Sequence, residues 1–114
     1  MQMLSTRGAA AVSPSAAILR GLAPDGGLYV PSMFPQISME RLSALCGTSY
    51  QNHAERILRS FLEDFSIAEI EEAVRAAYDA SSWDDHTIAP VKTLEPGLHV
   101  LELFHGPTLA FKDI

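Results

Sequence analysis

The stretch Thr48-Ser-Tyr-Gln-Asn-His-Ala-Glu-Arg-Ile-Leu-Arg-Ser-Phe-Leu-Glu-Asp-Phe-Ser-Ile-Ala-Glu-Ile-Glu-Glu-Ala-Val-Arg-Ala-Ala-Tyr78 decides the fold. Apolar residues recur in it at steps of three and four, as on one face of a helix. In the first half they are Tyr50, Ala54, Ile57, Leu58, Phe61, Leu62 and Phe65. In the second half they are Ile67, Ile70, Ala73, Val74, Ala77 and Tyr78. The pattern predicts two helices that form a hairpin broken near residues 64–66.

Capping residues indicate where these two helices begin. Ser66 is followed three positions later by Glu69, which is the spacing of a capping box. Thr48 and Gln51 show the same spacing and predict a similar start for the first helix.

Short elements are predicted before the hairpin. Residues 1–8 are expected to form a strand or an extended lead-in. Ser13 and Pro14 are typical of the first positions of a helix, and Gly21 is typical of its end.

A second group of short elements follows. Pro24-Asp-Gly-Gly27 predicts a tight turn, because proline presets φ and glycine accepts positive φ. Residues 28–30 read as a strand ended by Pro31, and Ser38 as the cap of a short helix over residues 39–45.

Strands are predicted after the hairpin, at residues 88–94 and, more strongly, at 98–104. We expect the second strand to be buried, with a turn at Gly106 and Pro107 after it. Thr108 is then expected to cap a helix that runs through Lys112. The chain therefore has an α+β pattern, helix-rich with a few short strands.

Composition excludes several classes of protein. A formal net charge of -6 argues against a nucleic-acid or anionic-membrane surface. The single cysteine, Cys46, is expected to be buried, and the histidines lack metal-ligand spacing, so we expect no metal site. No apolar run reaches the length of a membrane span. We expect a cytoplasmic protein.

The lysine at position 112 is the best candidate for chemistry. It follows the apolar, turn-forming lead-in His105-Gly-Pro-Thr-Leu-Ala-Phe-Lys112. Apolar neighbours favour the neutral form of an amine, which adds to an aldehyde to form a Schiff base. On the pattern alone, a solvated lysine is the other interpretation.

Four segments in order resemble the threonine synthases. They are Ser5-Thr-Arg-Gly8, Gly21-Leu-Ala-Pro-Asp-Gly-Gly-Leu-Tyr-Val-Pro31, Leu101-Glu-Leu-Phe-His-Gly106 and His105-Gly-Pro-Thr-Leu-Ala-Phe-Lys112-Asp113. From the residues alone, the first segment reads either as a phosphate contact or as a surface lead-in.

The resemblance implies that Lys112 holds pyridoxal 5′-phosphate (PLP) as an imine. It implies conversion of O-phospho-L-homoserine and water to L-threonine and phosphate, with PLP as the electron sink. It also implies that Phe111 packs near the cofactor and that Asp113 orients the helix start, so that Phe111, Lys112 and Asp113 form the cofactor-binding set.

The same resemblance implies a domain division. Residues 1–97 correspond to the small N-terminal domain that precedes the α/β PLP domains of fold type II enzymes, and residues 98–114 to the start of the PLP domain. Members of the family continue well beyond this lysine, so we expect residues 1–114 alone to bind PLP weakly, to lack synthase activity and to be marginally stable or self-associating.

Two alternatives stay open. A related PLP-dependent phospho-lyase acting on a similar substrate would carry the same lysine motif. A non-catalytic domain that packs on a partner is favoured if residues 98–104 form an exposed edge.

Overall fold

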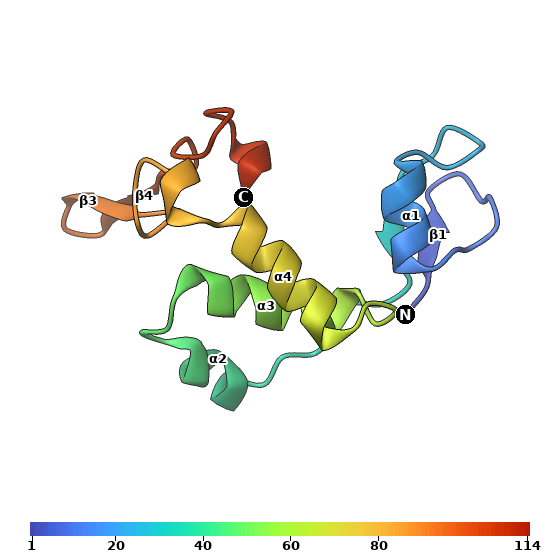
Figure 1. The fold of residues 1–114 in the computed structure, drawn as a ribbon, viewed down its shortest axis with the longest axis horizontal. Helices are drawn as coiled ribbons and strands as arrows, with labels where there is room; N and C mark the ends of the chain where they lie inside the picture. Colours follow the sequence, from blue (N-terminus) through green and yellow to red (C-terminus); the bar gives the residue numbers. More distant parts are fainter.

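The computed structural model describes residues 1–114 and shows an extended molecule in three parts (Figure 1). Helix α1 and a small sheet lie at one end, helices α2 to α4 in the middle, and a β-hairpin with the C-terminal loop at the other end. The radius of gyration is 16.3 Å, whereas a compact chain of this length has one of about 13 Å. Only 10 of the 114 residues are buried, so little of the apolar surface is packed away.

The predicted helical hairpin is confirmed as α3 (Tyr50–Phe61) and α4 (Ile67–Ala77). Its contact buries Ile70 and Val74 of α4. The capping box is complete, because the Ser66 hydroxyl accepts from the Glu69 amide while the Glu69 carboxylate accepts from the Ser66 amide. This local signal fixes where α4 begins.

Aromatic rings close the end of the hairpin. The rings of Tyr50 and Tyr78 meet edge to face with centroids 4.9 Å apart, and Trp83 follows at 5.7 Å from Tyr78. Burial raises the pKa of Tyr50 to about 12, and the neighbouring Tyr78 phenol adds to that shift. These rings extend the hairpin contact beyond α4 into the following loop.

The start of α3 differs from the prediction. Ser49, not Thr48, is the N-cap and accepts from the Asn52 amide at 3.3 Å. Gln51 cannot complete a box with Thr48, because its side-chain amide donates to the Tyr78 carbonyl at 2.9 Å. The Thr48 hydroxyl instead donates to the Leu45 carbonyl at 2.9 Å.

The N-terminal part contains β1 (Met3–Ser5), α1 (Pro14–Arg20) and β2 (Tyr29–Pro31). The two strands pair antiparallel, and α1 begins at Ser13 and ends at Gly21 as predicted. Asp25 joins the loops beside this sheet, since its carboxylate accepts from the Ser5 hydroxyl and from the amides of Ala9 and Gly27.

Helix α2 (Met39–Leu45) has the predicted bounds and the predicted cap, Ser38. Cys46 follows this helix and is exposed, so the expectation of a buried cysteine is wrong. The reason is that α2 buries none of its residues and offers no core for the thiol to enter.

The C-terminal strands are shorter and more exposed than predicted. Strands β3 (Val91–Glu95) and β4 (Leu98–Leu101) form an antiparallel hairpin, and every residue in them is exposed. Ile88 lies outside β3 because it is buried and has a φ of 68°, a left-handed conformation that a strand does not allow. The confirmed α+β architecture therefore includes a hairpin with both faces uncovered.

Candidate functional site

The candidate site is the lysine loop, defined here as residues 105–113. Short 3₁₀ helices lie before and within this region, η1 (Ala80–Ser82) and η2 (Phe111–Asp113). The predicted helix capped by Thr108 does not form. Instead, the Asp113 carboxylate accepts from the Thr108 amide at 2.8 Å and from its hydroxyl at 2.6 Å, so Thr108 is a donor to the end of the loop and does not cap a helix.

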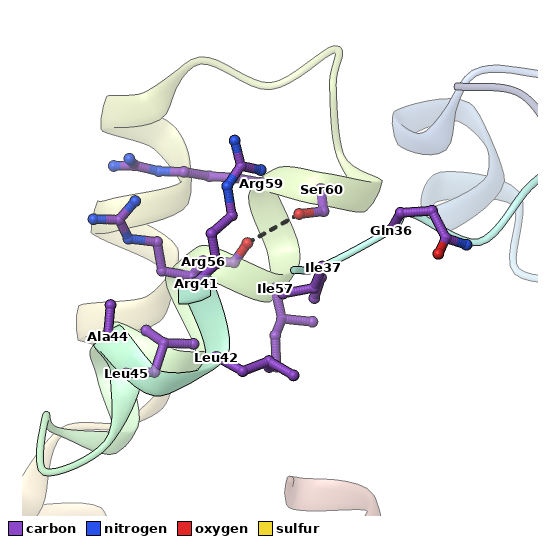
Figure 2. A pocket seen from close by; sticks show the side chains of 10 residues that line it. All are labelled: Gln36, Ile37, Arg41, Leu42, Ala44, Leu45, Arg56, Ile57, Arg59 and Ser60. Atoms are coloured by element: carbon purple, nitrogen blue, oxygen red, sulfur yellow. Dashed lines mark hydrogen bonds between the residues drawn. The ribbon is translucent and has the colours of Figure 1, made fainter. Parts of the chain in front are cut away.

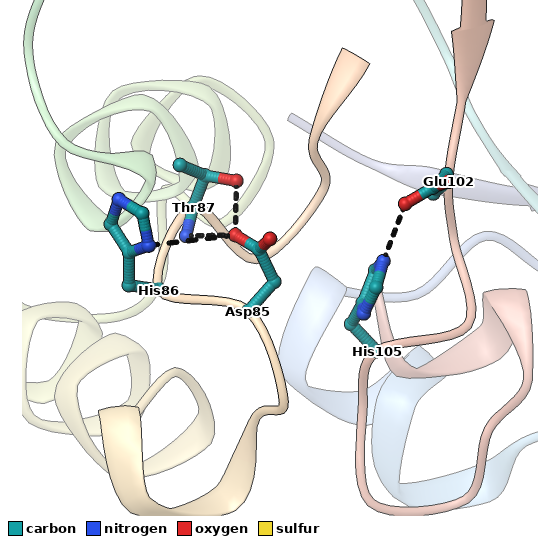
Figure 3. Close-up of polar contacts among 5 residues, drawn as sticks. All are labelled: Asp85, His86, Thr87, Glu102 and His105. Carbon is teal, nitrogen blue, oxygen red and sulfur yellow. Dashed lines mark hydrogen bonds and ion pairs between the residues drawn. The ribbon is translucent and has the colours of Figure 1, made fainter. Parts of the chain in front are cut away.

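Two contacts hold the start of the loop. The imidazole of His105 lies 2.8 Å from the Glu102 carboxylate, as Figure 3 shows. The His105 carbonyl accepts from the Asp84 amide at 2.9 Å. Side chain and backbone of the same residue are therefore tied to different segments.

A third contact closes the loop on itself. Hydrogen bonds from Thr108 hold the pKa of Asp113 below its usual value, with the hydroxyl as the larger cause. Leu109 between them has a φ of 58°, and its amide donates to the Gly106 carbonyl at 3.0 Å. The loop is thus a tight turn held at its end by a carboxylate that is ionised at neutral pH.

The three site residues predicted from sequence lie together on η2. Lys112 is exposed, and its amine has no hydrogen bond or ion pair to another residue. Phe111 is 67% exposed, and Leu109 equally so. The expectation that apolar neighbours surround Lys112 is therefore wrong for residues 1–114, because these side chains face outward.

Sequence reasoning missed the residues that support the loop, above all Trp83, Glu102 and the packing of Gly106. The signal for Trp83 is that it is the single tryptophan of the chain and lies shortly after α4, which ends at Ala77. The pairing of Glu102 with His105 at a spacing of three residues carries no helical signal, because this segment is extended.

The other segments singled out in the sequence have local roles. Ser5 donates its hydroxyl to Asp25 at 2.8 Å, and the Arg7 guanidinium donates to the Asp25 carbonyl at 3.3 Å. These contacts join β1 to the turn before β2. A similar pattern recurs at residues 85–87, where the Asp85 carboxylate accepts from the amide and hydroxyl of Thr87 (Figure 3).

A hollow between α2 and α3 has a volume of about 420 Å³ and carries several arginines. The hollow is lined by the side chains of Arg41, Arg56 and Arg59 together with apolar side chains such as Ile57 (Figure 2). Arg59 is paired with Glu55 and, at 2.8 Å, with Glu71. Lys112 is not among the residues that line this hollow, so the hollow lies apart from the lysine loop.

No group of three or more His, Cys, Asp or Glu side chains is placed to hold a metal ion. None of the helices combines the length and the apolar character needed to cross a membrane.

Comparison with known proteins gives consistent matches. The family model described as "Threonine synthase N terminus" matches residues 2–78. Threonine synthase from Methylobacillus glycogenes is 41% identical over 122 residues, covering 100% of this chain and 26% of that protein. The human protein named threonine synthase-like 1 is 39% identical over 103 residues, covering 88% of this chain and 14% of that protein.

Solved structures agree. The crystal structure of PLP-bound threonine synthase from Brucella melitensis has a TM-score of 0.90 and 42% identity, covering 100% of this chain and 25% of that one. This chain spans about a quarter of the length of the threonine synthases that it matches. The sequence match across most of the chain and the likeness in structure show that this chain belongs to the threonine synthase family.

Proposed function

We propose that residues 1–114 act as the N-terminal part of a PLP-dependent threonine synthase. The reaction converts O-phospho-L-homoserine and water to L-threonine and phosphate, and we place it in the cytoplasm. The observation that carries the proposal is an exposed lysine without a carboxylate partner, on a clamped loop, in a chain of this family.

Lys112 fits the role of the PLP-holding lysine. Its amine is accessible to an aldehyde, and no ion pair within residues 1–114 has to break first. PLP, when bound, supplies an electron sink for carbanions formed on the substrate. Nζ of Lys112, once displaced by the substrate amine, would hold and move protons as a general base.

The neighbours of Lys112 have separate proposed roles. Phe111 stands exposed one residue before the lysine and would pack against the cofactor ring. Asp113 follows it, and both of its carboxylate oxygens already accept from Thr108. Asp113 therefore supports the turn that carries Lys112. The proposed division into residues 1–97 and 98–114 remains a prediction, and the β3–β4 hairpin spans that boundary.

The test is a product assay on a longer polypeptide that carries residues 1–114 followed by a PLP domain. We expect threonine and phosphate to form in equal amounts from O-phospho-L-homoserine, and Lys112→Ala to abolish both products. Lys92→Ala is the matched control, because Lys92 is an exposed lysine on β3 outside the loop. Unchanged threonine formation by Lys112→Ala would refute the proposal.

A phospho-lyase is the second candidate. The lysine loop does not separate the two activities, because an exposed Lys112 amine without an ion-pair partner would hold PLP in either enzyme. Phosphate release without threonine in the same assay would support this candidate against the first.

The exposed β3–β4 hairpin also supports the third interpretation, a non-catalytic domain that packs on a partner. The partner we propose for it is the rest of the enzyme chain. In that case, removal of the hairpin would weaken binding of residues 1–114 to a separately expressed PLP domain.

A further inference from the structure

Trp83 links the helical hairpin to the lysine loop. Its indole is 7% exposed, and Nε1 donates to the carbonyl of Ala77, the last residue of α4, at 3.0 Å. The ring also lies against Tyr78, with centroids 5.7 Å apart. The position of the indole is therefore set by the end of α4.

Gly106 of the lysine loop packs directly on this indole. A Cβ at Gly106 would lie 2.9 Å from Cζ3 of Trp83, and 2.7 Å and 2.6 Å from Cβ and Oδ2 of Asp113. Gly106 is buried, and its φ is outside the left-handed region. Glycine is thus required at position 106 because a Cβ has no room there, and not because the backbone conformation excludes other residues.

Asp113 completes the connection. It touches Gly106 from the far end of the loop and is bonded to Thr108 through both carboxylate oxygens. Lys112 is its immediate neighbour in η2. A continuous series of contacts therefore runs from α4 through Trp83, Gly106 and Asp113 to the residue beside Lys112.

We propose that Trp83 and Asp113 are positioning residues, which seat the lysine loop on the end of α4 and so fix where the amine of Lys112 stands. This inference rests on the proposed function, because it takes Lys112 as the reacting lysine. It goes beyond that function by assigning the helical hairpin a part in catalysis. Neither residue needs to touch the substrate.

The decisive variants are Thr108→Val and Thr108→Ser. Valine removes the hydroxyl that donates to Asp113, whereas serine retains it. In the longer polypeptide that carries residues 1–114, we expect Thr108→Val and Asp113→Asn to lower kcat about 10- to 100-fold, because small displacements of a reacting group cost that much. Thr108→Ser should stay within about twofold of the parent protein, with KM changed little in all three.

A second readout does not depend on activity. Trp83 is the only tryptophan among the 114 residues, so its fluorescence reports on this contact. In the 114-residue chain, at a concentration where sedimentation velocity shows a monomer, we expect Gly106→Ala, Thr108→Val and Asp113→Asn to shift the emission to longer wavelength, as the loop leaves the indole and water reaches it. Thr108→Ser should leave the emission unchanged.

The two readouts separate the two claims. If the parent protein makes no threonine but the emission shifts as expected, the proposed function fails and the seating of the loop stands. If threonine is made, but Thr108→Val and Asp113→Asn keep the parent kcat and the parent emission, the positioning role is overturned. Should Gly106→Ala fail to fold, as circular dichroism would show, the Thr108 pair still decides.

Discussion

At the scale of single residues, Gly27 has almost no free space around its Cα. A Cβ there would lie 2.3 Å from Oγ of Ser5 and 3.0 Å from the Arg7 amide nitrogen. The same turn is held by Asp25, whose carboxylate accepts from the Gly27 amide at 2.9 Å. Gly27 and Gly106 thus serve the same purpose at two loops, each beside an aspartate that gathers hydrogen bonds.

Gly27→Ala is expected to lower the free energy of unfolding by about 1–3 kcal/mol, because overpacking forces neighbours to move. Since the closest atom is Oγ of Ser5, the double variant Ser5→Ala/Gly27→Ala should lose at least about 0.5 kcal/mol less than the sum of the single losses. Urea unfolding of the four proteins measures this coupling. Strict additivity would contradict the assigned contact.

Single residues also show what the sequence can predict. Ser13, Ser38 and Ser66 are recognisable as N-caps from the sequence because the amide that each side chain accepts from lies only three residues away. The prediction that Thr108 caps a helix is wrong because its hydroxyl donates to Asp113, five residues on, and is therefore not placed as a helix cap. The contact between Trp83 and Gly106 spans 23 positions and leaves no periodic signal.

At the scale of elements, α4 carries the clearest sequence signal and also the buried contact with α3. Its helical period and its capping box agree with each other, so its existence and its start were both predictable. Strand β4 is the opposite case. Its apolar residues indicate a buried strand, but burial depends on neighbouring strands, and residues 1–114 supply only β3.

Ser66→Ala tests the cap of α4. We expect it to lower the free energy of unfolding by about 1 kcal/mol, since an amide at the start of the helix loses its acceptor. Ser82→Ala is the matched control, because the Ser82 side chain makes no hydrogen bond in η1, and it should change stability by less than about 0.5 kcal/mol. Far-UV circular dichroism during urea unfolding measures both. Equal losses in the two variants would rule out the capping role.

At the scale of the whole molecule, acid should destabilise the fold. Hydrogen bonds hold the pKa values of six carboxyl groups below their usual values, most often through a nearby serine or threonine. These groups are Asp25, Asp64, Glu69, Asp79, Asp85 and Asp113. These carboxyl groups bind protons more readily in the unfolded chain than in the folded one. Their contribution to the free energy of unfolding is therefore present at pH values above their unfolded-state pKa, and it is lost as pH falls through their lower folded-state pKa.

The urea midpoint should therefore be lower at about pH 3 than at about pH 6. Asp85→Asn should reduce this difference, since its partner Thr87 then bonds to a neutral amide. Asp84→Asn is the control, because the Asp84 carboxylate accepts no hydrogen bond and this residue is tied to the fold through its backbone amide, which donates to the His105 carbonyl. A midpoint that is equal or higher at the lower pH would contradict the assignment.

The whole molecule also leaves 22 large apolar side chains exposed, and they include all of those on β3 and β4. Isolated residues 1–114 are therefore expected to self-associate. Sedimentation velocity should show a mass that rises with concentration. A monomer that stays monomeric and unfolds in one sharp thermal transition would contradict this expectation.

Whether Lys112 is the lysine that holds PLP can be read from a single labelling experiment. The PLP-loaded longer polypeptide is reduced with borohydride, digested and mapped by mass spectrometry. We expect a pyridoxyl group on the peptide that contains Lys112. A label on Lys92 with none on Lys112 would contradict it.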